Sequence, residues 1–377
     1  MEEVQYDTTI AVDLGNKFIK IKSSKNSYCF VNAMFPREQA GKSLLGSYIN
    51  WKKPKIFSTR LNEHKEMYFG PDLSEMGHET EWISSIGDGL SRYSSVEFQV
   101  MFEYAIALAV SDFEEEDVHI QLVTGLPTLD EKNEEIKQCL VEFLSGTHEV
   151  KIQDEISNEV FDITYTVDSI VVVPQYYGTL SHLAIDEDLN LQENRVTQEN
   201  VGVVDFGGGG ILIDVAHRLD LGASGFAWQE DLGVDAFHRA VDINSALSVY
   251  TIENLYIEGS EAEEYLYEPG NSKQVSDFTP AFMEQRRRAT EHVKNLYSRH
   301  FRKNEDISVI FQTGGGADFL LQKELQKELS SQIDIEFIDE PQMSNVNGYY
   351  KLGTYMQKMD SVNLPAEEEI EIVENGD

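Results

Sequence analysis

The sequence is poor in cysteine, in basic residues and in long apolar runs. Its 377 residues include only two cysteines, Cys29 and Cys139, far apart in the chain, so neither a disulfide framework nor a cysteine-rich zinc cluster is encoded. No apolar run approaches the ~18 residues that a membrane-spanning helix needs. The first residues also lack the basic stretch and apolar core of a secretion signal. We therefore expect a soluble protein of the cytoplasm, a reducing compartment, with no membrane partner.

Basic residues are outnumbered by acidic ones. Thirty Lys and Arg stand against 67 Asp and Glu, which gives a formal net charge of −37. Such a charge repels nucleic-acid phosphates over long range, so we expect no direct binding of nucleic acid. The apolar fraction of 41% and the charged fraction of 26% are those of ordinary globular proteins. At ~150 residues per domain, the length allows two or three domains.

The hydrophobic pattern alternates between two kinds of element. Segments 95–110 and 131–144 carry apolar residues at steps of three and four, which indicates amphipathic helices. Strands and helices mixed along one chain of this length predict an α/β fold. The short runs rich in β-branched residues that we expect to be buried strands are 8–12, 119–123, 169–173, 201–204 and 308–312.

One local pattern occurs twice. A strand ends in Asp13-Leu14-Gly15 and is followed by a second strand at 18–21, and a later strand ends in Asp205-Phe206-Gly207 and is followed by one at 211–215. The two aspartates lie 192 positions apart, which is too long a period for a solenoid. We therefore expect two similar domains that each contribute a β-hairpin to a shared cleft.

Glycine-rich turns after these strands suit a phosphate ligand. Glycine has no Cβ, so successive backbone N–H groups can converge on an anion. A carboxylate beside a bound phosphate needs a cation between them, which predicts that Asp13 and Asp205 hold Mg²⁺, mainly through water. A third glycine turn follows the strand at 308–312, where a helix N-terminus could meet a nucleotide. The residues that we expect to contact the nucleotide are Asp13, Gly15, Asn16, Lys17, Lys20, Gly207, Gly208, Gly209, Gly210, Gly314, Gly315 and Gly316.

These motifs resemble those of a known superfamily. Asp13-x-Gly15 with Lys20, the segment 203–209 and the segment 313–317 are similar to the first phosphate loop, second phosphate loop and adenosine loop of the actin, Hsp70 and sugar-kinase superfamily, in the same order. Segments 123–127, 173–175 and 345–349 resemble, within it, the plasmid-segregating bacterial actins, the ParM-like proteins.

The resemblance implies a set of roles for individual residues. It implies ATP with Mg²⁺ as the ligand, with GTP left open, and it adds Asp318 to the cofactor-binding residues. It assigns catalytic roles to Gln175, which would orient the attacking water, and to Asp205. Two positions depart from the family: Gly210-Ile211 stands where threonine is usual, and Lys17 stands where small hydroxyl residues are common. Lys17 could add charge at the phosphates or point to solvent.

The resemblance also implies an architecture and a function. The expected fold is the actin-like two-domain α/β fold with a nucleotide cleft between the domains. Domain I would span 1–180 with a small inserted subdomain at about 36–90, domain II 181–341, a C-terminal return to domain I 342–363, and an acidic disordered tail 364–377. The implied protein is a nucleotide-driven, filament-forming ATPase that segregates or positions plasmid DNA. Its partners would be copies of itself and a DNA-bound adaptor protein.

Two alternatives from the same superfamily remain open. A small-molecule kinase would need a base carboxylate and a substrate pocket in the cleft. An Hsp70-like ATPase would bind nucleotide without forming filaments. Residues 285–303 form a separate feature, because they hold seven basic residues against one acid, Glu291. They can be a solvated helix face or a contact with a neighbouring acidic subunit.

Overall fold

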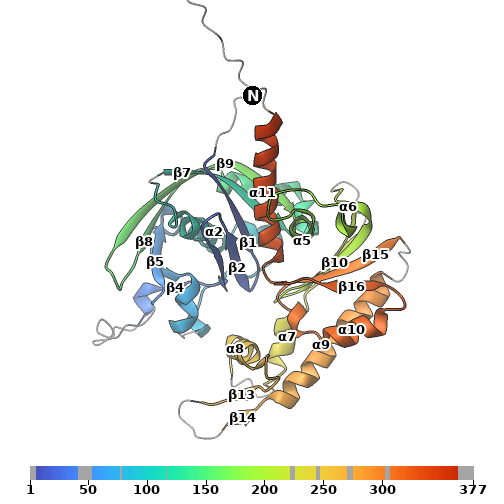
Figure 1. The fold of residues 1–377 in the computed structure, drawn as a ribbon. Helices are drawn as coiled ribbons and strands as arrows, with labels where there is room; N and C mark the ends of the chain where they lie inside the picture. Colours follow the sequence, from blue (N-terminus) through green and yellow to red (C-terminus); the bar gives the residue numbers. More distant parts are fainter. Residues whose placement is uncertain are drawn as a thin grey trace, which may run out of the picture.

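The structure is a computed structural model that describes residues 6–40, 53–76, 79–115, 117–220, 226–242, 247–269, 275–301 and 306–363. The predicted acidic tail at 364–377 lies outside these residues. Two β-sheets lie side by side with one long helix, α11 (Ser344–Asn363), standing between them (Figure 1). We call the nine-stranded sheet with its helices the first lobe, and the five-stranded sheet with its helices the second lobe.

The first lobe is built on a mixed sheet in the order β3-β2-β1-β7-β9-β8-β5-β6-β4. Its strand β1 pairs antiparallel with β2 and parallel with β7, so the first Asp-x-Gly hairpin stands beside a parallel core. The strands are β1 (Thr8–Leu14), β2 (Phe18–Lys22), β3 (Ser27–Val31), β4 (Phe35–Pro36), β5 (Lys55–Thr59), β6 (Met67–Phe69), β7 (Asp117–Leu126), β8 (Gly146–Gln153) and β9 (Val160–Pro174).

Helix α2 (Val96–Val110) forms the centre of the first core. Twelve of its residues are buried, as is typical of a helix covered on all sides. Ser95 begins it, because its side chain accepts a hydrogen bond from the backbone N–H of Phe98 at 3.2 Å. Shorter helices complete this lobe: η1 (Arg37–Gln39), η3 (Arg60–Asn62), η4 (Pro71–Met76), η5 (Glu79–Glu81), α1 (Gly89–Tyr93), α3 (Thr128–Glu131) and α4 (Glu134–Leu144).

The second lobe repeats the hairpin arrangement on a smaller sheet, in the order β12-β11-β10-β15-β16. Strand β10 pairs antiparallel with β11 and parallel with β15, as β1 does with β2 and β7. Its strands are β10 (Asn200–Phe206), β11 (Ile211–His217), β12 (Ala227–Glu230), β15 (Ile307–Thr313) and β16 (Asp334–Phe337), with a separate pair, β13 (Leu266–Tyr267) and β14 (Ser276–Asp277). Its helices are α6 (Arg195–Gln198), α7 (Val234–Arg239), α8 (Val249–Gly259), α9 (Thr279–His300), η6 (Ala317–Phe319) and α10 (Gln322–Leu329).

Helices α5 (Gln175–Ala184) and α11 cross closely beside β1 and β7. A Cβ added to Gly348 would lie 1.7 Å from the carbonyl oxygen of Gly178. Any side chain at Gly348 would therefore force the two helices apart. The tight crossing fixes how the N-terminal ends of both helices, which carry site residues, stand relative to the sheets.

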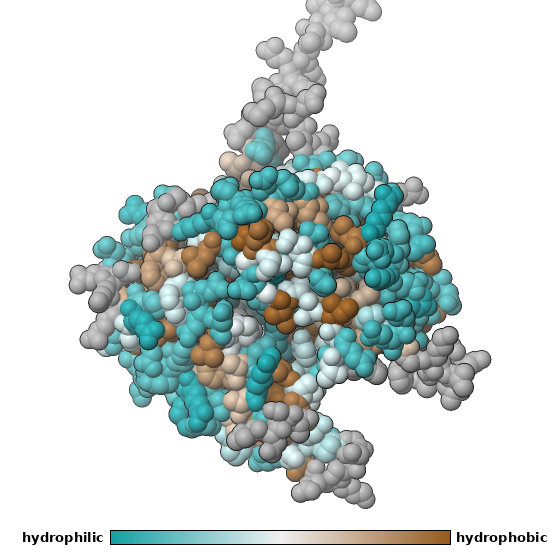
Figure 2. All heavy atoms as spheres, turned by 180° about the vertical axis from the view of Figure 1, so that it is seen from behind, coloured by the Kyte–Doolittle hydropathy of each residue, from teal (hydrophilic) through white to brown (hydrophobic). Residues whose placement is uncertain are grey.

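The strands expected from the sequence are confirmed, each one lengthened by one or more residues, and so are the helices at 95–110 and 131–144 in their main part. The domain boundaries at 180 and 341 stay predictions. Within the stretch 36–90, strands β5 and β6 are hydrogen-bonded members of the first sheet. Among the described residues, no helix is long and apolar enough to cross a membrane. Hydrophilic residues dominate the face shown in Figure 2, and hydrophobic ones form small separate groups there.

Candidate functional site

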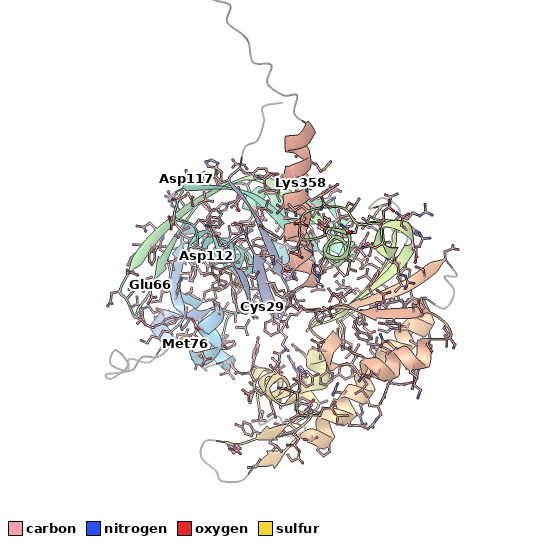
Figure 3. All side chains as sticks on the ribbon, viewed as in Figure 1. Cys29, Glu66, Met76, Asp112, Asp117 and Lys358 are labelled. Carbon is pink, nitrogen blue, oxygen red and sulfur yellow. The ribbon has the colours of Figure 1, made fainter. Side chains whose placement is uncertain are left out.

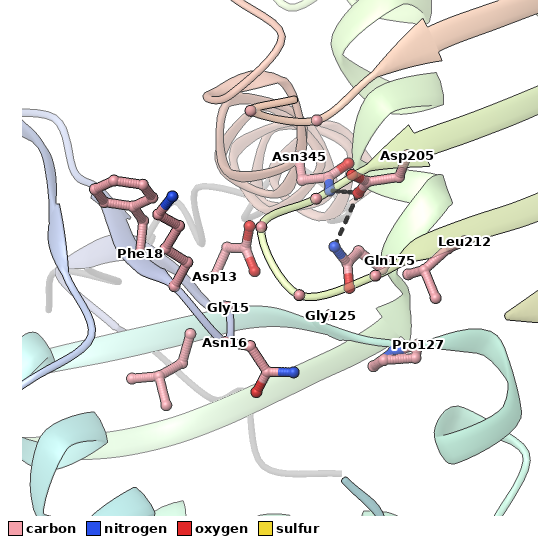
Figure 4. Close-up of a pocket in the computed structure, with 18 of the residues that line it drawn as sticks. Asp13, Gly15, Asn16, Phe18, Gly125, Pro127, Gln175, Asp205, Leu212 and Asn345 are labelled. Atoms are coloured by element: carbon pink, nitrogen blue, oxygen red, sulfur yellow. Dashed lines mark hydrogen bonds between the residues drawn. The ribbon is translucent and has the colours of Figure 1, made fainter. Parts of the chain in front are cut away.

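A pocket opens between the two lobes where both Asp-x-Gly hairpins end. The turns after β1 and β10 form two of its walls, and the turn after β15 and the N-terminal ends of α5 and α11 close it (Figure 4). In parallel sheets the carboxyl ends of the strands meet at one edge, which is the usual place for a ligand in open α/β sheets. The predicted site residues that line the pocket are Asp13, Gly15, Asn16, Lys17, Lys20, Gln175, Asp205, Gly207, Gly208, Gly209, Gly210, Gly314 and Gly315.

Asp13 and Lys20 form one charged pair of the pocket. They face each other across the β1–β2 hairpin, and their Oδ2 and Nζ atoms are 3.0 Å apart. Burial acts to lower the pKa of the Lys20 ammonium, but the nearby carboxylates of Asp13 and Asp205 help to raise it above its ordinary value. Lys20 therefore carries a full positive charge between the two hairpins.

Asp205 is held from two helices at once. The amide nitrogens of Gln175 at the start of α5 and of Asn345 in the first turn of α11 each donate to its Oδ2 at 2.9 Å (Figure 4). The carbonyl oxygen of Asn345 accepts from the Thr179 hydroxyl at 2.7 Å, which fixes the orientation of that amide. Burial raises the pKa of Asp205, the Lys20 ammonium opposes this, and the Asp13 carboxylate adds to it.

The second glycine turn is held by the start of α7. The backbone N–H groups of Gly233, Val234 and Asp235 donate to the carbonyl oxygens of Gly209, Gly207 and Gly208 at 3.0–3.2 Å. The Gly207 N–H is also used within the turn, in a 2.9 Å bond to the Gly210 carbonyl oxygen, which leaves the N–H groups of Gly208, Gly209 and Gly210 for an anion in the pocket.

The third turn approaches Asp205 directly. Gly314 has φ = +87°, and a Cβ there would lie 2.2 Å from Asp205 Oδ1. Only glycine can take this conformation and leave room for the carboxylate.

Lys17 lines the pocket, but its ammonium is paired with carboxylates, and its predicted contact with the nucleotide stays a prediction. Its ammonium forms ion pairs with Asp235 on α7 and, at 3.0 Å, with Glu253 on α8, both in the second lobe. Its side chain is only 6% exposed, which excludes the alternative that it points to solvent. Gly316 and Asp318 are not among the residues that line the pocket. The Gly316 N–H is used instead in a 2.7 Å bond to the Phe206 carbonyl, and the roles predicted for Gly316 and Asp318 stay predictions.

Comparisons with known proteins fit this geometry. The family model described as the N-terminal domain of actin-like proteins matches residues 11–178. Among solved structures, the apo pSK41 ParM protein is 21% identical with a TM-score of 0.70, and the match covers 94% of this chain and 99% of that one. This chain has an actin-like fold. No curated protein sequence matches it.

Two further solved structures share the actin-like fold. The actin-like protein Alp7A is 17% identical with a TM-score of 0.72, over 94% of this chain and 98% of that one. Bacillus thuringiensis ParM with ATP is 15% identical with a TM-score of 0.69, over 94% of this chain and all of that one. The resemblance to the actin-like superfamily, and within it to ParM-like proteins, is thereby confirmed, as is the predicted fold.

Some residues of the actin-like cleft cannot be predicted from the sequence. Asn345 lies in one of the segments that resemble bacterial actins, but nothing in the sequence indicates that its amide meets Asp205, 140 positions away. Arg92 is buried, and its guanidinium donates to the Leu14 carbonyl oxygen at 2.6 Å, which helps to hold the turn after β1 in place. Glu253 carries its carboxylate to the wall of the pocket from α8. Each is placed by tertiary packing, for which a single sequence contains no signal.

The donor set of the actin-like cleft fits a hydrated divalent cation rather than a bare one. Asp13 and Asp205 both line the pocket and influence the same Lys20 ammonium. Among the described residues, no three His, Cys, Asp or Glu side chains gather so that they alone could hold a metal. Mg²⁺ accepts this arrangement, because it keeps several waters and takes one or two carboxylates together with phosphate oxygens.

Proposed function

We propose that this chain is a nucleotide-driven, filament-forming actin-like ATPase that segregates or positions plasmid DNA through a DNA-bound adaptor protein. The observation that carries the proposal is the pocket in which Asp13, Lys20, Asp205 and Gln175 meet three glycine turns. A solved relative of the same fold, Bacillus thuringiensis ParM, was obtained with ATP, and other relatives carry the ParM and Alp7A names. The first fact supports ATP as the nucleotide here, and the second supports a function like that of the plasmid-segregating bacterial actins.

The polar groups of the cleft would have different roles according to their charge. The N–H groups of the glycine turns and the Lys20 ammonium would bind the phosphates. Asp13 and Asp205 would hold Mg²⁺ through its waters, and the bound ion would offset negative charge on the phosphate oxygens. Gln175 donates one amide hydrogen to Asp205, so its carbonyl oxygen can accept from a water and orient it. Attack of that water on the terminal phosphorus would break the bond to the ADP oxygen and give ADP and inorganic phosphate, with the proton of the water passing to a phosphate oxygen or to solvent.

A phosphate-release assay with a pelleting assay tests this function. The purified chain with Mg-ATP should release phosphate and sediment as filaments that electron microscopy shows. Asp205→Ala should fold but release no measurable phosphate, because the ion and its waters lose their anchor. Asp162→Ala, the same change at a side chain that is 84% exposed on β9, is the matched control and should behave as the wild type.

The two alternative functions predict different results in the same phosphate-release and pelleting assays. A small-molecule kinase would transfer phosphate to an added substrate and would not sediment. An Hsp70-like ATPase would hydrolyse ATP as a monomer. Phosphate release by a folded Asp205→Ala variant at the wild-type rate would reject the assignment of Asp205 to the nucleotide site.

A further inference from the structure

Lys17 joins the two lobes across the nucleotide pocket. It sits in the turn between β1 and β2 of the first lobe, and both of its carboxylate partners, Asp235 and Glu253, belong to helices of the second lobe. All three side chains are largely buried, with exposures of 6% for Lys17, 22% for Asp235 and 13% for Glu253. Burial limits screening by salt, and removing one partner would leave a buried charge without its counter-charge.

The aliphatic part of the Lys17 side chain also contacts the second lobe. A Cβ added to Gly208 would lie 2.7 Å from the Cβ of Lys17, so the aliphatic part of Lys17 rests directly on the second glycine turn. That turn is in turn bonded to the start of α7, which carries Asp235. Lys17 therefore contacts both the phosphate-binding turn of the opposite lobe and the helix that supports it.

An aromatic contact lies on the same side of the cleft. Trp82 of the first lobe and Tyr250 on α8 have ring centroids 5.2 Å apart. Tyr250 precedes Glu253 by one helical turn, so the aromatic pair and the ion pairs engage the same helix. Together they connect α8 to the first lobe, and α8 lies well away from α5 and α11 (Figure 1).

We propose that Lys17 is a positioning residue that holds the cleft closed through Asp235 and Glu253, and thereby slows the release of bound nucleotide. It would act on the lobes rather than on the phosphates, since its ammonium is already taken up by two carboxylates. The proposal rests on the proposed function only in that a nucleotide occupies the pocket. Removing Lys17 takes away the first-lobe cation that attracts these two carboxylates of the second lobe and leaves them buried without a counter-charge, which weakens the contact that holds the lobes together.

Release of a fluorescent ADP analogue from the purified full chain, followed by stopped flow, tests the proposal. Lys17→Met should speed release at least about tenfold, an effect of the size expected when one partner of a buried ion pair is removed. Lys17→Arg keeps the cation and should retain slow release. Lys25→Met, at an exposed lysine in the β2–β3 turn, is the matched control and should release ADP as the wild type does.

A double-mutant cycle separates this role from a phosphate contact. If Lys17 acts through Asp235, Asp235→Asn should also speed release, and adding it to Lys17→Met should produce little further change. If Lys17 instead bound phosphate, Asp235→Asn would free its ammonium for the phosphates and would slow release. Slower release by Asp235→Asn would overturn the proposal, as would wild-type release by Lys17→Met.

A second measurement needs no nucleotide. Small-angle X-ray scattering of the nucleotide-free protein should show a larger radius of gyration for Lys17→Met than for the wild type. The variant Asp235→Asn with Glu253→Gln, which keeps Lys17, should show the same opening and covers the case in which Lys17→Met does not fold. Identical scattering from all folded variants would reject the closure role. A wild-type chain that binds no nucleotide would instead reject the proposed function, and scattering would still test the role of Lys17.

Discussion

Asp214 on β11 gives the protein a pH dependence that can be worked out in advance. Its carboxylate is buried between the lobes, where it accepts a 2.6 Å hydrogen bond from the Thr128 hydroxyl of α3. Burial raises the pKa of Asp214 from 3.8 to about 7, the Thr128 bond opposes this, and the nearby Asp205 carboxylate adds to it. In the unfolded chain the same group titrates near its ordinary value.

The direction and size of the effect follow from linkage. Because the folded protein binds the Asp214 proton more tightly than the unfolded chain does, this group lowers the free energy of unfolding as pH rises from about 4 to about 7. A shift of about three units corresponds to about 4 kcal/mol at 1.36 kcal/mol per unit. With an unfolding entropy of ~2.1 cal/mol/K per residue, that equals a Tm change of about 5 °C for a chain of this length.

The substitution Asp214→Asn measures how much the ionisation of Asp214 contributes to the pH dependence of stability. Asparagine is neutral and keeps an oxygen for the Thr128 hydroxyl, so the variant should melt about 5 °C above the wild type at pH 8 and at the same temperature near pH 4. Thermal melts of both proteins across this range measure the difference, and groups that do not interact with Asp214 titrate alike in both and cancel. Asp277→Asn is a control of opposite sign, because backbone N–H donation from Thr279 lowers the pKa of that exposed carboxyl.

Two results would refute the reasoning about Asp214. One is a Tm difference that does not grow between pH 4 and pH 7. The other is an Asp214→Asn variant that is less stable than the wild type at pH 8. Either would mean that the carboxylate is better solvated, or better paired, than its burial indicates.

Two further changes test the cleft and the surface. Gln175→Ala should slow phosphate release by ~10²-fold or more while nucleotide-driven sedimentation survives, because the water loses its orienting amide while Asp205 keeps its hydrogen bond from Asn345. Normal turnover would return Gln175 to a structural role beside Asp205. Arg287→Glu with Arg288→Glu should impair sedimentation in Mg-ATP without loss of nucleotide binding, because both side chains are 64% exposed on α9 and pair only with Glu284 of the same helix among the ion pairs of the described residues. Sedimentation equal to that of the wild type at every salt concentration would reject a contact through this face.

The structure narrows what the basic run at 285–303 can contribute. Arg286 is not a surface charge, because it is 11% exposed and its guanidinium donates to the Phe319 carbonyl at 3.1 Å. Lys294 pairs with Glu328 on α10 at 2.7 Å. Because these basic side chains already have partners within the same protein, part of the basic run 285–303 is better interpreted as a solvated helix face. Arg302 and Lys303 lie outside the described residues. For this reason the test above is limited to Arg287 and Arg288.

The parts of the fold that the sequence predicts are those set by local pattern. Strands β1, β10 and β15 each contain a short run of apolar residues and are followed by a glycine-rich turn, a pattern typical of buried strands next to tight turns. The pairing of Asp13 with Lys20 also follows from spacing, because a short hairpin places these positions opposite each other. Spacing along the chain does not predict the surroundings of Cys29. This residue lies where the first lobe faces the second, and it contacts Gln342 (Figure 3).

The rest of the site depends on contacts between distant segments. The direction of Lys17 could not be predicted, because both of its partners lie more than 200 positions away on helices whose placement depends on the whole second lobe. The amide of Asn345 is oriented by Thr179, which is brought near only by the crossing of α5 and α11. In both cases the residue type is compatible with several roles, and burial beside particular partners selects one of them.

The position of Asp205 connects the chemistry of the cleft to its shape. Its Oδ2 is held by Gln175 and Asn345, so the carboxylate that we assign to the metal is tied to both α5 and α11. These helices cannot slide freely, because Gly178 and Gly348 meet with no room for a side chain. A change of charge at Asp205 therefore acts on a rigid pair of helices beside β1, while Lys17 closes the other side of the cleft. The rigid pair of helices and the Lys17 contact thus lie on opposite sides of one pocket. A nucleotide-dependent change in the spacing of the lobes requires such an arrangement.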